Sequence, residues 1–244
     1  MTDTPTPDTR PVIEVCLTPA LWYQHDFIGK NVVVIDIIRA TSTIASALFH
    51  GVHKMIPVET VEEAEQYLAK GFLVAGERDG YRIPHFNFGN SPFEFMGEEV
   101  KGKDIIHTTT NGTRCVLMAK GAHNIIAGSF LNMESILNWI KGENRDTILF
   151  CAGWKDHYNM EDALFAGAVV RMLSDDFRVI DDATLSVKVQ YRYVRMNMLR
   201  TIKQAQHFKR LTKLGIEKDI KFCMGHHRFD VIPIYDGEGF IAMH

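Results

Sequence analysis

The sequence predicts an α/β fold, with a mainly parallel sheet, helices on both faces and a helical C-terminal extension. Short β-branched runs alternate with helical patterns from residue 12 to about residue 178, which is typical of parallel sheets. Residues 31–38 form an almost continuous β-branched run, as expected for a strand buried on both faces. Beyond about residue 180 these runs stop, and the chain becomes polar and helical.

The alternation predicts a set of strands and helices in a regular order. The expected strands cover residues 12–17, 31–38, 54–58, 72–75, 104–107, 124–127 and 147–151. The expected helices cover residues 40–49, 59–70, 112–121, 132–141 and 160–173. A long loop over residues 76–92, rich in Gly, Asn, Pro and aromatic residues, interrupts the pattern, and loops of this length are usually functional.

The chain is expected to divide into three parts. Residues 1–11 are polar and proline-bearing and predict a flexible tail, and residues 12–178 predict an α/β catalytic core. Residues 179–244 predict a helical extension packed on the core, because residues 181–210 are polar and helical. The short segment 231–234 contains Pro233, which removes a backbone donor, so it is expected to be an edge strand at best.

The sequence contains two pairs of segments that resemble each other and form a weak internal repeat. Residues 36–43 resemble residues 104–111, and each segment is followed by a helix, a Gly-x-His step and a strand. Residues 75–79 likewise resemble residues 152–156. The repeat indicates either an internal duplication or a chance likeness between strand–helix turns.

Composition and charge narrow the class of protein. The 244 residues carry a net charge of −3, which gives no basic surface for nucleic acid, and no apolar run reaches the roughly 18 residues that span a membrane. The four cysteines form no Cys-x-x-Cys pair, so we expect a reducing, cytoplasmic location and no structural zinc. The N-terminus does not resemble a signal peptide. Whether the chain forms a homo-oligomer stays open.

The turn that ends the strand at residues 104–107 carries the strongest functional signal. Three threonines, an Asn-Gly pair, a fourth threonine and an arginine lead into a helix, whose free backbone N–H groups attract anions. We expect this turn to bind phosphate through Thr109, Thr110, Asn111, Gly112, Thr113 and Arg114. The alternative is an ordinary helix cap with spare threonines.

Asp36 interrupts an otherwise apolar strand. A buried carboxylate is costly unless it is paired, hydrogen-bonded or bound to a cation, so Asp36 is either salt-bridged to Arg39 or a metal ligand or nucleophile. Arg39 precedes a helix start that carries Thr41 and Ser42, and this arrangement suits a second anion contact. Because the carboxyl ends of parallel strands share one edge, these residues are expected to meet the threonine-rich turn in one cleft.

Three further carboxylates are candidates at the same edge. Glu161 and Asp162 open the helix at residues 160–173, and Glu77 lies in a glycine-flanked turn. Each has a plainer interpretation: acids at a helix start favour its dipole, and a loop acid is commonly solvated. Together with Asp36 they provide the oxygen ligands that Mg²⁺ prefers, with Asp36, Arg39 and Glu161 as the catalytic candidates.

The loop at residues 76–92 also offers polar contacts. Asn90 and Ser91 either contact the ligand as the loop closes or cap the next helix. The chain contains no Gly-x-x-x-x-Gly-Lys-Ser/Thr phosphate loop, no Gly-x-Gly-x-x-Gly and no Gly-x-Ser-x-Gly.

These motifs, taken in order, resemble the 2-phosphosulfolactate phosphatase family, the ComB-like proteins. The resemblance rests on Val34 to Thr43, Ala75 to Arg78, Phe86 to Pro92, Thr109 to Arg114, and Cys151-Ala-Gly153 with Glu161-Asp162, and it covers roughly residues 12 to 235. It implies an α/β fold and Mg²⁺-dependent hydrolysis of 2-phosphosulfolactate to sulfolactate, a step toward coenzyme M. His85 and Asn87 replace a glycine and an acid of the family's motif, which affects substrate detail more than reaction class.

The sequence therefore predicts a phosphatase for a small, highly anionic phosphorylated acid, with Mg²⁺ as cofactor. The alternative is a non-catalytic protein that binds a phosphorylated or sulfonated metabolite. The sequence leaves open whether water or Asp36 attacks phosphorus.

Overall fold

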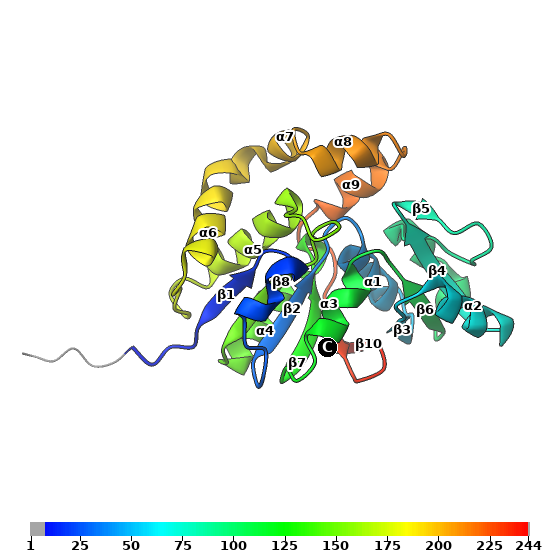
Figure 1. Cartoon of the computed structure of the whole chain (residues 1–244), viewed down its shortest axis with the longest axis horizontal. Coiled ribbons are helices and arrows are strands. Elements are labelled where there is room, and N and C mark those ends of the chain that lie inside the picture. Colours follow the sequence, from blue (N-terminus) through cyan, green and yellow to red (C-terminus); the bar gives the residue numbers. More distant parts are fainter. Residues whose placement is uncertain (1–7, 244) are drawn as a thin grey trace, which may run out of the picture.

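A computed structural model describes residues 8–243 and contains one ten-stranded mixed sheet with helices on both faces (Figure 1). The strand order is β1-β8-β2-β7-β9-β10-β3-β6-β4-β5. The strands are β1 (Ile13–Cys16), β2 (Asn31–Ile35), β3 (Lys54–Pro57), β4 (Leu73–Arg78), β5 (Tyr81–Arg82), β6 (Asp104–Thr108), β7 (Asn124–Gly128), β8 (Thr147–Cys151), β9 (Ile232–Tyr235) and β10 (Phe240–Met243). The α/β class and the mainly parallel pairing are therefore confirmed.

The helices follow the predicted order through the first two thirds of the chain. They are α1 (Ala40–Phe49), α2 (Val61–Ala69), α3 (Gly112–Met118), α4 (Met133–Glu143), α5 (Met160–Met172), α6 (Asp182–Val194), α7 (Met198–Ile202), α8 (Gln206–Thr212) and α9 (Glu217–Cys223). Short 3₁₀ turns cover Pro19–Gln24, Pro92–Phe95, Glu98–Val100, Phe130–Asn132 and Arg195–Asn197. The predicted helical extension is present: α6 to α9 form an arc that passes over one end of the sheet (Figure 1).

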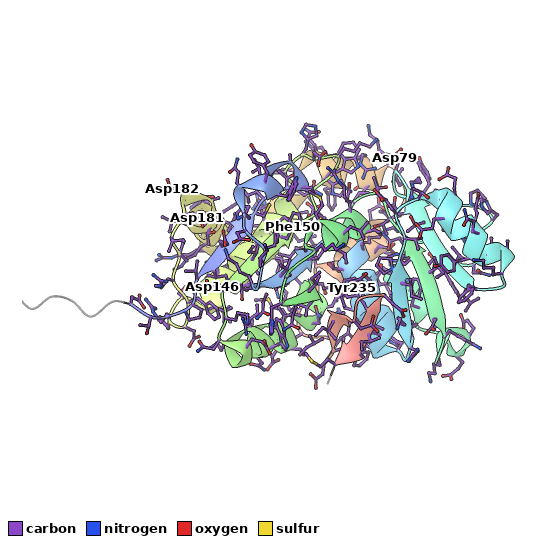
Figure 2. All side chains as sticks on the ribbon, turned by 60° about the horizontal axis from the view of Figure 1, so that its bottom comes forward. Asp79, Asp146, Phe150, Asp181, Asp182 and Tyr235 are labelled. Atoms are coloured by element: carbon purple, nitrogen blue, oxygen red, sulfur yellow. The ribbon has the colours of Figure 1, made fainter. Side chains whose placement is uncertain are left out.

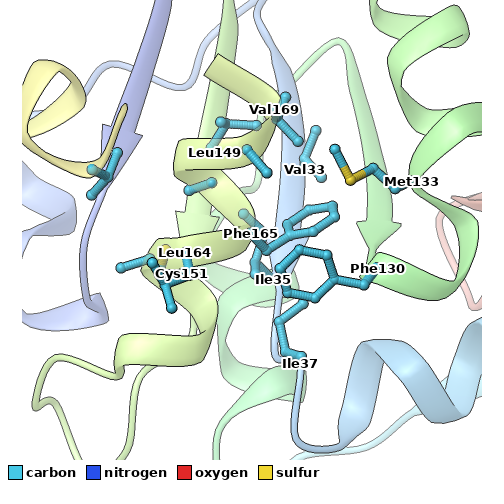
Figure 3. Close-up of a cluster of buried hydrophobic side chains, with 14 of the residues drawn as sticks. Val33, Ile35, Ile37, Phe130, Met133, Leu149, Cys151, Leu164, Phe165 and Val169 are labelled. Atoms are coloured by element: carbon cyan, nitrogen blue, oxygen red, sulfur yellow. The ribbon is translucent and has the colours of Figure 1, made fainter. Parts of the chain in front are cut away.

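Strand β2 lies at the centre of the larger part of the core. Its successive residues alternate between the two faces, and all five are buried. Val33 and Ile35 pack with Phe130 and Phe165 beneath α5 (Figure 3), whereas Val32 and Val34 pack on the opposite face with α1 and α3. Burial on both faces explains the almost uninterrupted apolar sequence of this strand.

The internal repeat has a counterpart in the topology. The series β2-α1-β3-α2-β4 and β6-α3-β7-α4-β8 are equivalent, and each places its first strand between the other's second and third strands. The turns agree in detail: His53 N–H donates to the Lys103 carbonyl at 3.0 Å, and His123 N–H donates to the Lys30 carbonyl at 2.7 Å. Asp36 and Asp104 are not equivalent, however, because Asp36 follows β2 whereas Asp104 begins β6.

The prediction of an edge position for residues 231–234 is wrong. The antiparallel pair β9–β10 lies in the middle of the sheet and joins the group β1-β8-β2-β7 to the group β3-β6-β4-β5. Tyr235, at the end of β9, accordingly lies well inside the outline of the molecule (Figure 2). Pro233 is tolerated there because β9 pairs with β7 through one register position only, Ile126 with Ile234.

Two local predictions also need correction. The expected loop at residues 76–92 begins inside β4, which continues to Arg78 and turns back as β5. Of the expected flexible tail, residues 1–7 lie outside the described part, and Pro11 is tied to the core by a 2.8 Å hydrogen bond from Arg178 N–H. No helix among residues 8–243 is long and apolar enough to cross a membrane.

Candidate active site

A small polar cavity of about 30 Å³ lies at the carboxyl ends of β2, β4, β6 and β8, beneath α8. This volume holds roughly two water molecules. Its walls come from both halves of the sheet and from the C-terminal extension. The lining residues are Asp36, Ile38, Arg39, Glu77, Asp79, Gly80, Asn90, Thr110, Asn111, Trp154, His207, Arg210 and Leu211.

Asp36 is placed by the turn between β2 and α1. The Thr41 hydroxyl donates to the Asp36 carbonyl at 2.9 Å, and the Ala40 N–H donates to Asp36 Oδ1 at 3.3 Å. The start of α3 approaches from the other side, and a Cβ at Gly112 would lie 2.9 Å from Ala40 Cβ and 3.3 Å from Asp36 Oδ2. The glycine therefore lets the starts of α1 and α3 meet at this carboxylate.

Arg39 does not pair with Asp36. Its Nη1 donates to Asp219 of α9 at 2.6 Å in a buried ion pair, and its Nη2 donates to the Gly80 carbonyl at 3.0 Å. Ser91 donates to the other oxygen of Asp219 at 3.0 Å. The salt-bridge explanation for Asp36 is therefore excluded, and Arg39 and Ser91 join the extension to the core.

Glu77 joins two loops at the cavity. One carboxylate oxygen accepts the Gly80 N–H at 2.6 Å, and the other accepts the N–H and the hydroxyl of Thr110 at 2.8 and 2.9 Å. Glu77 is buried, so it is not a solvated loop acid. It holds the threonine-rich turn against the β4–β5 turn.

Glu161 and Asp162 take different roles, as expected for adjacent helical residues that point about 100° apart. Glu161 Oε1 contacts His207 Nδ1 of α8, while its Oε2 is buried and has no hydrogen-bond partner in the described part of the chain. Asp162 accepts the N–H groups of Ile37 at 2.9 Å and Gly153 at 3.1 Å. Asp162 thus ties the end of β2 to the end of β8.

Burial and the crowding of carboxylates raise the pKa of two members of the cluster. Burial raises the pKa of Asp36 to about 7, and repulsion from Glu77 and Glu161 adds to the effect. Burial, followed by repulsion from Glu161 and Asp36, raises the pKa of Asp162 well above its ordinary value. These two carboxyls therefore keep protons that ordinary carboxyls lose, and such shifts are common at functional sites.

The threonine-rich turn is divided between two surfaces. Asn111 lines the cavity, Thr109, Thr113 and Arg114 line an outer groove beside the start of α2, and Thr110 lies at the border and lines both. Arg114 is half-exposed and pairs with Asp156 at 2.8 Å. The structure thus separates Arg114 from the carboxylate cluster.

The remaining predicted contacts are placed as follows. The hydroxyls of Thr41 and Ser42 donate to backbone carbonyls at 2.9 and 2.8 Å, so both serve the turn that carries Asp36. Asn90 lines the cavity and its Oδ1 lies 3.1 Å from His107 Nε2. Burial lowers the pKa of His107 to about 4, so this histidine is neutral and donates to Asn90.

The donor set fits a hard cation such as Mg²⁺. Within residues 8–243, the buried Glu161 Oε2 has no hydrogen-bond partner, and the buried Asp36 carboxylate forms no ion pair. Among residues 8–243 no three acidic, histidine or cysteine side chains form a ready-made metal cluster. This still suits Mg²⁺, which commonly takes one or two protein carboxylates and fills its other positions with water and phosphate oxygens.

The sequence interpretation missed four residues of the site, all of them in or facing the extension. They are Trp154, His207, Arg210 and Asp219. The available signal was slight: His207 and Arg210 lie three positions apart on one helix, and Trp154 follows a glycine at the end of β8.

Together, the fold and the site define an α/β enzyme whose carboxylate-rich active site lies at the carboxyl ends of its strands. A family model described as 2-phosphosulpholactate phosphatase matches residues 16–238. The chain belongs to this family, which confirms the resemblance seen in the sequence and the enzyme class, a phosphoric monoester hydrolase.

Individual relatives agree with the family match. A "Probable 2-phosphosulfolactate phosphatase" of Caldanaerobacter subterraneus subsp. tengcongensis is 42% identical over 217 residues, which cover 86% of this chain and 89% of the relative. A protein with the same description from Thermotoga petrophila is 39% identical, covering 84% and 88%, and one from Clostridium acetobutylicum is 36% identical, covering 85% and 90%.

Proposed function

We propose that this chain hydrolyses 2-phosphosulfolactate, or a closely related phosphorylated hydroxy acid, to the hydroxy acid and phosphate, with Mg²⁺ as cofactor. The observation that carries the proposal is the buried carboxylate cluster, in which Asp36 has a pKa of about 7 and Glu161 has an oxygen without a partner in the described chain. The name carried by the relatives supports the choice of substrate.

In this proposal Asp36 and Glu161 hold the cation. The bound cation would offset negative charge on the phosphate and lower the pKa of a coordinated water. Asp36 then loses its proton near neutral pH, because a neighbouring cation favours the ionised form. Thr110 and Asn111 of the α3 turn face the phosphate position, and Glu77 fixes Thr110 through two hydrogen bonds. We favour a water nucleophile over Asp36.

The roof of the cavity limits the entry of solvent water. His207 and Arg210 of α8 cover the carboxylates. The ion pair between Asp219 and Arg39 holds α9 against the wall of the cavity. Exclusion of bulk water strengthens the interactions between the phosphate and fixed charges. Since all four cysteines are buried free thiols, we also infer a reducing compartment, as in the cytoplasm. A place on a route toward coenzyme M is part of the same proposal.

The test measures phosphate release from 2-phosphosulfolactate and from a panel of phosphorylated hydroxy acids. Chelation should abolish release and added Mg²⁺ should restore it. Glu161→Gln keeps the shape of the side chain but removes its charge, so it should lower turnover and also reduce the rise in melting temperature that Mg²⁺ produces. Full turnover in a thoroughly chelated sample would remove the metal from the proposal. Binding without any phosphate release would favour the non-catalytic alternative.

A further inference from the structure

Three side chains form a wall between the carboxylate cavity and a second, larger hollow. They are Trp154, His207 and Arg210, and each of them lines both spaces. The second hollow measures about 390 Å³, and its other walls include Tyr158, Met160 and Ala205. The first cavity, at about 30 Å³, is too small for more than a phosphate-sized group, so the rest of a substrate needs the larger space.

The Arg210 guanidinium has a donor without an acceptor in the described part of the chain. Its Nη1 donates to the Asp79 carbonyl at 2.9 Å, and its Nη2 lies 2.9 Å from His207 Nε2. Figure 2 shows Asp79 beside the C-terminal helices. The Arg210 Nε is buried without a hydrogen-bond partner, and no side chain among residues 8–243 forms an ion pair with this guanidinium. Burial lowers the pKa of Arg210 from its usual value, so the charge is held against a solvation cost.

Trp154 packs against this guanidinium and offers a second donor without a partner in the described chain. The Arg210 guanidinium lies 4.5 Å from the centre of the indole ring, and His207 stacks on the ring at 6.3 Å. The indole Nε1 is buried and has no partner in the described chain. A buried donor without an acceptor destabilises the protein, so two such donors in one wall indicate that a ligand acceptor completes the site.

We propose that Arg210 and Trp154 hold a second anionic group of the substrate, a carboxylate or sulfonate carried beside the phosphate ester. The phosphate then lies at Asp36 and Glu161, and the rest of the ester faces the larger hollow. This inference rests on the proposed function, because it assigns the non-reacting end of the same substrate. This assignment also gives α8 a specific role, because its Arg210 would distinguish phosphate esters that carry a second anionic group from phosphate esters that carry none.

The experiment compares kcat/KM for 2-phosphosulfolactate with that for isopropyl phosphate, which has no second anion. Arg210→Gln should lower the ratio of the two values by ~10- to 100-fold, as expected for the loss of a charged hydrogen bond. Trp154→Phe keeps an aromatic ring but removes the N–H, and should lower the ratio by roughly 3- to 10-fold. Arg200→Gln, at an exposed position on α7, is the matched control and should leave the ratio unchanged.

A second measurement is calorimetric titration with sulfolactate, which lacks the phosphate. The parent protein should bind it, and Arg210→Gln should bind it more weakly by a similar factor. An equal loss of activity on both esters would mean that the wall only positions His207, and an unchanged ratio would mean that water completes the donors. Either result overturns the inference.

The failure of the proposed function would be visible separately. In that case the parent protein would release phosphate from neither ester. The titration then decides the inference: equal binding of sulfolactate by the parent and by Arg210→Gln refutes it, and a loss confined to the variant supports it. Circular dichroism of each variant checks that the fold is retained.

Discussion

Replacing Asp36 with Asn should stabilise the metal-free protein at alkaline pH while it removes activity. Asp36 is buried, and its pKa of about 7 lies well above the ordinary value of 3.8. Each pKa unit is worth about 1.4 kcal/mol, so ionising Asp36 at pH 8 costs the folded state on the order of 4 kcal/mol relative to the unfolded chain. Asn removes the charge, and its carbonyl oxygen can still accept the Ala40 N–H.

The sign of the pH dependence follows from the raised pKa. Between about pH 4 and pH 7 the folded state keeps a proton on Asp36 that the unfolded chain has lost, so the parent loses stability as the pH rises through this window. The variant lacks this group. The difference in unfolding free energy between variant and parent should therefore be small at pH 4 and greatest at pH 8.

Urea denaturation in EDTA at pH 4, 6 and 8 measures this difference, and the same samples give turnover after Mg²⁺ is restored. Added Mg²⁺ should stabilise the parent more than Asp36→Asn, because the parent offers the ionised carboxylate. A variant that is less stable than the parent at pH 8, or a difference that does not grow with pH, would refute the reasoning. Near-normal turnover by the variant would separately remove Asp36 from the chemistry.

Two further variants test the placement of the arginines. Asp219→Asn leaves Arg39 buried without its charged partner and should cost about 3–5 kcal/mol in urea denaturation, whereas the exposed Asp175→Asn should cost almost nothing; equal costs would contradict the ion pair's role. Arg114→Ala should lower kcat/KM less than about fivefold, because Arg114 is half-exposed and paired with Asp156 outside the carboxylate cavity. A hundredfold fall in kcat/KM would instead show that Arg114 contacts the phosphate.

The sequence predicted the part of the site that follows from strand ends. Asp36 and Thr110 follow β-branched runs, and Glu77 lies near the end of β4. Parallel strands bring such positions to one edge, so the meeting of these residues could be inferred from the sequence. The sequence also indicated that an anion would be bound there, but not which threonines face the cavity. That depends on the rotation of α3 about its axis, which a short turn does not encode.

Local sequence patterns could not predict the residues that cover the cavity. His207 and Arg210 lie in a polar helical segment whose periodicity shows a helix but not the place where it docks. Their position depends on distant contacts such as the pair between Arg39 and Asp219. The central position of β9 was missed for a related reason. Pro233 lacks a backbone N–H and so favours an edge strand, but β9 lies where it does because β9 and β10 join two groups of strands that are distant in the sequence.

The β9–β10 pair makes completion of the sheet depend on residues far along the chain from most of the strands that they join. Until Ile232–Tyr235 and Phe240–Met243 leave the ribosome, the two parallel groups of strands have no bridge, and β7 and β3 each keep an open edge. Open edges invite pairing with other chains. A nascent chain therefore carries exposed strand edges until residues 232–243 have been synthesised, and a variant without these residues would keep the two open edges permanently.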